Sequence, residues 1–181
     1  MELIKNFKNN ILIKNLFLAI LGTILLTLSS KIKIPFWPVP MTMQTFVVLL
    51  IGVLYGWKLG MLTVSLYLIQ GLAGLPVFAG TPEKGLGLVY FTGPTMGYLI
   101  GFLVAVYLSG FFNYNNNFFK NFIKLVFSVS FIYLLGLIWL GFLIGWDKPI
   151  FKLGAQPFLL AELFKVLILA ILIPKISKLK I

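Results

Sequence analysis

Glu162 and Lys165 are the residues whose types and spacing most suggest chemistry, because both lie inside an otherwise apolar segment. Residues three apart share one face of a helix. An ionisable side chain at mid-membrane costs about 2.5 to 3.5 kcal/mol, so such residues are functional candidates by default. The lysine, beside a helix N-terminus, suits an anionic ligand, and the carboxylate suits ligand N–H groups or Lys165 itself. The alternative is a pair that only neutralises its own charges.

A glycine-rich apolar segment, residues 71–95, is a second candidate for contact with a ligand. Glycine allows close backbone approach, so peptide groups here could touch a ligand directly. The alternative is an ordinary surface loop with turn residues. Gly80 and Gly85 have phosphate-loop spacing, but Leu86 and Gly87 stand where Lys and Ser or Thr are required. The sequence therefore predicts no ATP site in this chain.

Other kinds of chemistry are excluded by the residues that the sequence lacks. It contains no Cys and no His, so it cannot form a disulfide, a Cys/His zinc site, a catalytic thiol or an imidazole base. Its four acidic residues are scattered, which gives no clustered metal site for an intramembrane enzyme such as a lipid-modifying transferase. We expect no enzymatic activity, no metal and no cofactor.

The composition of the chain indicates which elements must position these residues. Of 181 residues, 60% are hydrophobic and 10% charged, against roughly 45 to 50% apolar and about 25% charged in soluble domains. The segments 34–57, 59–82, 85–119 and 125–146 carry no charge, and each exceeds the ~20 residues that a helix needs to cross a bilayer. A water-soluble globule is therefore excluded. Lipid offers backbone groups no hydrogen-bond partner, so we expect the spans to be helices.

We predict an all-α integral membrane protein, a single domain over 1–181 with six transmembrane helices. The predicted spans are 15–30, 41–55, 59–72, 94–111, 124–144 and 157–173. The first span resembles a signal peptide but lacks an Ala-x-Ala cleavage site, so it is counted as a span. Three connections, 34–40 (loop 1), 71–93 (loop 3) and 145–156 (loop 5), are rich in Pro and Gly, and we expect them to be non-helical and to share one face.

The lysine residues predict the orientation in the membrane. All basic residues are Lys, and they stand at the ends of apolar runs, which favours a role in topology over nucleic-acid binding. One face receives Lys5, Lys8, Lys14, Lys58, Lys120, Lys124, Lys175, Lys178 and Lys180, and the other receives Lys31, Lys33, Lys84, Lys148 and Lys152. The richer face is the cytoplasmic one by the positive-inside tendency, so we expect a multi-pass protein of the cell membrane with both termini in the cytoplasm.

Small residues recur at every fourth position in the first span, at Ala19, Thr23 and Thr27. Stripes of this kind let helix backbones approach closely in lipid. Similar stripes stand at 52, 56 and 60 and at 93, 97 and 101. Each stripe could pack inside this chain, and the stripe of the first span could instead dock a partner.

Four long motifs closely resemble the BioY family, the biotin-binding S components of energy-coupling factor (ECF) transporters. They are 34–45 (IPFWPVPMTMQT), 71–80 (GLAGLPVFAG), 93–101 (GPTMGYLIG) and 157–165 (PFLLAELFK). The resemblance implies a six-helix S-component bundle with an outward-facing vitamin pocket. It also implies a transmembrane coupling subunit and ATP-binding subunits on other chains, with Thr23 and Thr27 matching the positions that dock the coupling subunit and Ala19 one turn earlier.

The resemblance also implies which residues bind biotin. Lys165 with the N-terminus of the last helix suits the carboxylate of biotin, and Glu162, Gln44, Thr95 and the loop-3 backbone at Ala79, Gly80 and Gly85 suit the ureido group. Phe78, Tyr90 and Tyr98 would form apolar walls. Alternatively, Glu162 and Lys165 exchange these roles with other polar groups. The family more usually has Asp at the position of Glu162, and in this chain residues 81–84 intervene after 78–80.

Two alternative functions remain open at this point. One is a solitary facilitator for biotin or another small organic anion. The other is a non-catalytic membrane assembly subunit, in which Glu162 and Lys165 would have no ligand. In each case the partners are the lipid bilayer and a small molecule or protein, with no nucleic acid.

Overall fold

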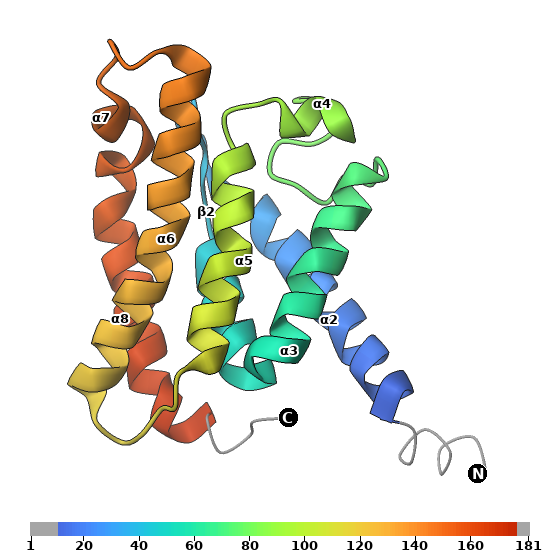
Figure 1. The fold of residues 1–181 in the computed structure, drawn as a ribbon, viewed down its shortest axis with the longest axis vertical. Helices are drawn as coiled ribbons and strands as arrows, with labels where there is room; N and C mark the ends of the chain where they lie inside the picture. The colour runs from blue at the N-terminus through green and yellow to red at the C-terminus, as the bar shows by residue number, and fades with distance from the viewer. Residues whose placement is uncertain (1–10, 177–181) are drawn as a thin grey trace.

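A computed structural model describes residues 11–176 and shows a bundle of long helices (Figure 1). The elements are α2 (Ile11–Lys31), β1 (Lys33–Ile34), β2 (Met41–Thr42), α3 (Gln44–Leu72), α4 (Leu88–Phe91), α5 (Met96–Phe111), α6 (Phe118–Ile144), α7 (Ile150–Gly154), the 3₁₀ helix η1 (Gln156–Phe158) and α8 (Leu159–Ile176). The strands β1 and β2 pair antiparallel and hold the ends of loop 1 together.

The element α3 consists of two helices that fold back on each other at Gly56. Gly56 has φ 70° and ψ 175°, a conformation that glycine adopts at little cost. In a straight helix, Gln44 and Tyr67 would be about 34 Å apart at 1.5 Å per residue. Instead Gln44 Nε2 donates a hydrogen bond of 2.6 Å to Tyr67 Oη. The two halves of α3 are the predicted second and third spans, so the prediction of six long helices is confirmed.

Length and hydropathy agree with a membrane location. Among the described residues, four helical segments are long and apolar enough to cross a membrane: α2, α3, α6 and the segment Ile150–Ile176. α5 is a shorter apolar helix and lies in the centre of the bundle, between α3 and α6 (Figure 1). Glycines allow this central position, since a Cβ at Gly101 would approach Ile132 Cα to 2.6 Å and one at Gly110 would collide with the backbone of Trp57. The Gly101 stripe therefore packs inside the chain.

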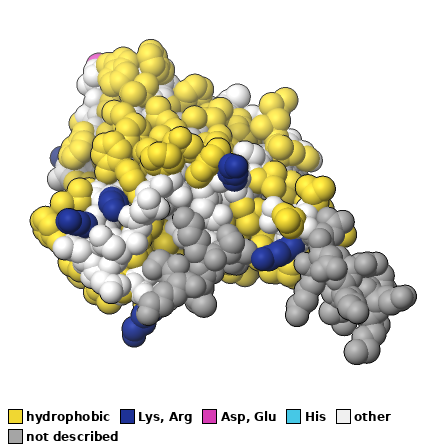
Figure 2. Space-filling view, turned by 60° about the horizontal axis from the view of Figure 1, so that its bottom comes forward, with side chains coloured by type: hydrophobic (Ala, Val, Ile, Leu, Met, Phe, Trp, Pro, Cys, Tyr) yellow, Lys and Arg dark blue, Asp and Glu magenta, His cyan; other side chains and the backbone are white. Residues whose placement is uncertain are grey.

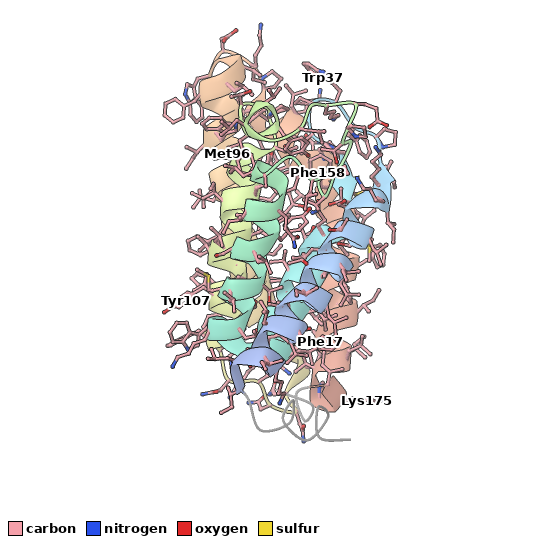
Figure 3. All side chains as sticks on the ribbon, turned by 90° about the vertical axis from the view of Figure 1, so that its right-hand side faces the viewer. Phe17, Trp37, Met96, Tyr107, Phe158 and Lys175 are labelled. Carbon is pink, nitrogen blue, oxygen red and sulfur yellow. The ribbon has the colours of Figure 1, made fainter. Side chains whose placement is uncertain are left out.

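Loops 1, 3 and 5 lie at one end of the bundle, as predicted. Trp37 of loop 1 marks this end in Figure 3, and α4 and α7 mark it in Figure 1. Lys175 lies at the other end, and lysine side chains surround that face in Figure 2. The predictions for both termini, including Lys5, Lys8, Lys178 and Lys180, concern residues outside the described range.

The structure corrects several local predictions. Loops 3 and 5 are not free of helix, because each contains a short helix, α4 or α7, in a stretch without proline. The second span begins at Gln44 rather than at residue 41, since Met41 and Thr42 pair with β1. α6 begins six residues before the predicted position, at Phe118, because the side chain of Asn117 accepts a hydrogen bond from Lys120 N and caps the helix.

Candidate functional site

A cavity of about 50 Å³ lies toward the loop end of the bundle, where residues from seven elements and two loops meet. Its polar lining comes from β2, α3, α4, α5, α6 and α8, and its apolar lining includes residues of loops 1 and 3 and of η1. The lining residues are Val39, Pro40, Met41, Thr42, Gln44, Thr45, Ala79, Tyr90, Thr95, Tyr98, Leu99, Phe102, Ile132, Tyr133, Phe158, Glu162 and Lys165. Small-molecule sites are usually about 300 to 1,000 Å³, so these walls must move apart to admit a ligand.

Glu162 and Lys165 form a buried ion pair at the inner part of this cavity. Lys165 Nζ lies 3.2 Å from Glu162 Oε2, and the two residues are only 8% and 4% exposed. Lys165 Nζ also donates to Thr42 O at 2.7 Å and to Thr45 Oγ1 at 3.0 Å. An ammonium group has three N–H donors, so these three oxygen atoms use all of them.

The two carboxylate oxygens of Glu162 have different surroundings. Oε2 accepts from Thr45 Oγ1 at 2.8 Å, from Tyr133 Oη at 2.9 Å and from Lys165 Nζ. Oε1 is buried and has no hydrogen-bond partner within residues 11–176. A buried polar atom without a partner costs free energy, and Glu162 lines the cavity. The arrangement therefore holds the carboxylate in place by one oxygen and leaves the other for a ligand N–H group.

Tertiary packing brings this cluster together from three helices. Thr45 is in the first turn of α3, Tyr133 is in the middle of α6, and Glu162 is in the first turn of α8. The two partners are 117 and 29 residues from Glu162 along the chain. The apolar sequence around each of these polar groups places them in lipid-covered helices, where pairing with one another satisfies their hydrogen-bonding capacity.

A second group of hydrogen bonds fixes the loops around the cavity. Tyr67 Oη donates to Val77 O at 2.9 Å and accepts from Gln44 Nε2. Tyr90 Oη donates to Ala79 O at 2.8 Å. Burial raises the pKa of the Tyr90 hydroxyl, so this group stays protonated and remains a donor. Tyr98 Oη likewise donates to Gly154 O at 2.7 Å. These tyrosines hold loops 3 and 5 through backbone carbonyls.

Seven of the ten predicted binding residues line the cavity, and three do not. Those that do are Gln44, Ala79, Tyr90, Thr95, Tyr98, Glu162 and Lys165. Phe78, Gly80 and Gly85 are not part of this lining, and their contact with a ligand stays a prediction. Phe78 is only 1% exposed and its ring packs against Tyr67 and Tyr90 instead. Gly80 and Gly85 have φ of 79° and 92°, so their role is to shape loop 3.

Sequence reasoning missed three polar groups of the site. Thr42 and Thr45 flank Gln44 in a motif that was identified, but their hydroxyls carry no charge to single them out. Tyr133 was not distinguished from the other aromatic residues of its span. A signal was present, because a hydroxyl in mid-membrane requires a partner. Its partner, Glu162, lies on another helix and could not be assigned from local spacing.

The stripe of small residues on α2 faces the inside of this chain. Ala19 and Thr23 are 0% and 2% exposed, and Thr27 is half-buried. A Cβ at the neighbouring Gly22 would collide with the side chain of Thr63 on α3, which shows how closely the two helices approach. Ala19 and Thr23 are therefore not on an exposed docking surface. Burial of these two residues favours packing within the chain, and docking of a coupling subunit by the stripe stays a prediction.

A second cavity, of about 470 Å³, lies between α6, α7 and α8. Ser130, Tyr133 and Glu162 are its polar lining residues, and the others are Val126, Val129, Leu134, Leu137, Phe151, Ala155, Leu159, Leu163 and Val166. Glu162 and Tyr133 border both cavities. The smaller cavity holds far more polar groups, so hydrogen-bonding chemistry, rather than size, identifies the candidate site.

Comparison with known proteins assigns the chain to a family. The model of the BioY family matches residues 4–180, nearly the whole chain. The chain belongs to the BioY family. A BioY relative from Pyrococcus horikoshii, described as a probable biotin transporter, is 35% identical over 152 residues, which cover 84% of this chain and 89% of that protein. The biotin transporter BioY of Thermotoga maritima is 33% identical over 93% of this chain and 98% of its own length.

A solved structure agrees with the BioY assignment at the level of the fold. The crystal structure of the S component for biotin from an ECF-type ABC transporter superimposes with a TM-score of 0.76 and 28% sequence identity. The match covers 92% of each chain. The predicted six-helix S-component bundle is therefore confirmed for this BioY protein.

Proposed function

We propose that this BioY protein is a membrane-embedded subunit that binds biotin and mediates its uptake from outside the cell. Its relatives are biotin transporters and its fold is that of a biotin S component, so it is a transport component rather than an enzyme. The observation in this chain that carries the proposal is the unpartnered Oε1 of Glu162, a residue that lines a mainly apolar cavity. Biotin offers two ureido N–H donors on an apolar bicycle, which suits that oxygen and those walls.

Lys165 has a different role in this proposal from the one that the sequence predicts. Its three N–H donors already contact Thr42, Thr45 and Glu162, so none is left for a ligand carboxylate. We propose that Lys165 keeps Glu162 ionised and oriented, and that the ureido ring of biotin lies inward against Glu162. The carboxylate then lies toward the loops. Ala79 supports this orientation, since it lines the cavity and its backbone N–H makes no hydrogen bond within the described residues.

Uptake against a gradient needs an energy source from other chains. The sequence has no phosphate-binding loop, so we propose that a transmembrane coupling subunit and ATP-binding subunits act with this protein. The positions of the lysines support an orientation with both termini in the cytoplasm. Cysteines placed at 83 and 147 in this Cys-free chain should then react with an impermeant maleimide in intact cells, whereas a cysteine at 115 should not. The reverse pattern would overturn the orientation.

Ligand binding by the purified protein tests the proposed function. We expect stoichiometric binding of biotin and of desthiobiotin, which keeps the ureido group, in calorimetry. Lipoate has the same pentanoate chain but no ureido group, and we expect no binding. Equal binding of lipoate would show that the carboxylate, not the ureido group, is recognised. Biotin uptake into liposomes that contain this protein alone would favour the solitary facilitator.

A further inference from the structure

Lys31, the last residue of α2, holds loop 3 through its side chain. Its Nζ donates to Pro76 O at 2.8 Å and to Phe78 O at 3.0 Å. It also lies 3.3 Å from Thr81 O and 3.2 Å from Thr81 Oγ1. One ammonium group thus contacts three residues of loop 3 that are 45 to 50 positions away along the chain. Hydrogen bonds from a charged donor are the stronger kind.

The other backbone carbonyls of the segment 76–81 also accept hydrogen bonds. Ser30 Oγ donates to Val77 O at 2.8 Å, beside the bond from Tyr67. Ala79 O accepts from Tyr90 Oη, and Gly80 O accepts from Lys84 N at 2.8 Å. With the contacts of Lys31, every backbone carbonyl from 76 to 81 has a hydrogen-bond donor. A glycine-containing loop is therefore fixed by side chains of α2, α3 and α4 instead of by a regular element of its own.

This segment forms part of the wall of the binding cavity. Ala79 lines the cavity, and Tyr90, which bonds to Ala79 O, lines it as well. The cavity of about 50 Å³ must widen to admit a bicyclic ligand, and the helices that form its inner part pack closely around glycines. Segment 76–81 of loop 3 belongs to no helix or strand, and most of the hydrogen bonds to its carbonyls come from side chains of neighbouring elements. The strength of those bonds then sets how readily the wall opens.

We propose that Lys31 is a positioning residue of the biotin site, and that its hold on the segment 76–81 controls how fast biotin leaves. Lys31 does not line the cavity, so it acts through the loop rather than by contact with the ligand. This inference rests on the proposed function, since biotin is the ligand whose release would be followed. The end of α2 then has a role in ligand retention, in addition to the topological role of the Lys31 charge at the membrane surface.

Dissociation of radiolabelled biotin from the full-length protein in nanodiscs tests the proposal. Lys31→Met should speed dissociation at least about tenfold, because it removes a charged donor from three loop residues. Lys33→Met is the matched control. It removes the same charge two residues away, and the Lys33 side chain makes no hydrogen bond within the described part of the chain, so we expect wild-type dissociation. Lys31→Arg keeps charge and donors and should restore slow release, which a loss of general stability would not allow.

The outcomes separate this inference from the proposed function. Normal biotin binding by the wild type, with unchanged dissociation from Lys31→Met, overturns the role of Lys31 alone. Equal acceleration by Lys33→Met shows that surface charge is responsible and also overturns it. No binding by the wild type overturns the proposed function and the role of Lys31 with it. If Lys31→Met does not fold, Lys31→Gln removes the charge and shortens the donor instead, and wild-type dissociation from that variant would refute the proposal.

Discussion

Two lysine-centred clusters surround the binding cavity, and their difference shows how recognition and positioning are divided. Around Lys165, the acceptors include a carboxylate, both partners are buried, and one carboxylate oxygen has no partner among the described residues. Around Lys31, the acceptors are neutral carbonyls and a hydroxyl at the surface, and each of the carbonyls is paired. The first cluster has an oxygen left for a ligand, whereas the second only fixes a loop.

The physical setting explains why the two clusters differ in energy. A buried ion pair depends on its partners, because removal of one leaves an uncompensated charge in a medium of low polarity. An exposed lysine can return to water when its contacts are lost, so its replacement costs less. We therefore expect substitutions at the inner cluster to abolish binding and those near loop 3 to change its rate.

The largest effect is expected from Lys165→Ala. Loss of this cation leaves the carboxylate of Glu162 buried without compensation, which typically costs about 3 to 5 kcal/mol. We expect biotin binding to disappear in calorimetry while the protein still elutes as a folded species. The double variant Glu162→Gln with Lys165→Met should be better folded than Lys165→Ala, yet should not bind. Unchanged affinity of Lys165→Ala would show that the ion pair has no part in the site.

A smaller effect is expected from Tyr133→Phe. This change removes one donor to Glu162 Oε2 and keeps the ring in place. A hydrogen bond to a charged group contributes about 1.5 to 3 kcal/mol, which corresponds to about tenfold to a hundredfold weaker binding. Tyr107→Phe is the control, since the Tyr107 ring packs only near Trp57 and Phe111 among the described aromatic residues. Equal affinity of both variants would remove Tyr133 from the recognition cluster.

The effect of Tyr67→Phe on biotin binding should be smaller than that of Tyr133→Phe. Tyr67 connects the two regions. Its hydroxyl accepts from Gln44 in the cavity wall and donates to Val77 O in loop 3. We expect faster biotin dissociation together with a loss of stability of about 1 to 3 kcal/mol, since Gln44 loses a buried partner. Tyr55→Phe, on the same element, provides the control. If dissociation is unchanged although the melting temperature falls, the connection between the regions is structural only.

The smallest effect on affinity is expected on α2, away from both clusters. Thr23→Phe should destabilise the protein by about 1 to 3 kcal/mol through overpacking, because Thr23 is buried. Ile24→Phe, on the exposed face of α2, should leave stability unchanged. Biotin affinity should stay near that of the wild type in Ile24→Phe. If Thr23→Phe is as stable as wild type but fails to co-purify with the coupling subunit, the docking role of this stripe would be restored.

Local patterns in the sequence determined the main framework. Charge-free segments longer than a bilayer span predicted helices that cross a membrane, because the cost of a charge in lipid depends on the segment itself, and charges with Pro and Gly divided the chain into six spans. Proline and glycine placed the loops, and an even number of crossings placed loops 1, 3 and 5 at one end, as observed. The three-residue spacing of Glu162 and Lys165 predicted a pair on one face, and the two side chains lie 3.2 Å apart.

Only the tertiary structure decided which helix faces meet, and that determined the rest of the site. Thr45 and Tyr133 reach Glu162 because α3, α6 and α8 are rotated toward a common axis, and helical periodicity within one segment carries no information on such rotation. The same limit explains why Ala19 and Thr23 are buried and why the ring of Phe78 packs against Tyr67. Lys31, predicted from sequence only as a surface charge, holds loop 3 because the turn of α3 at Gly56 and the loop that follows it return the chain to the end of α2.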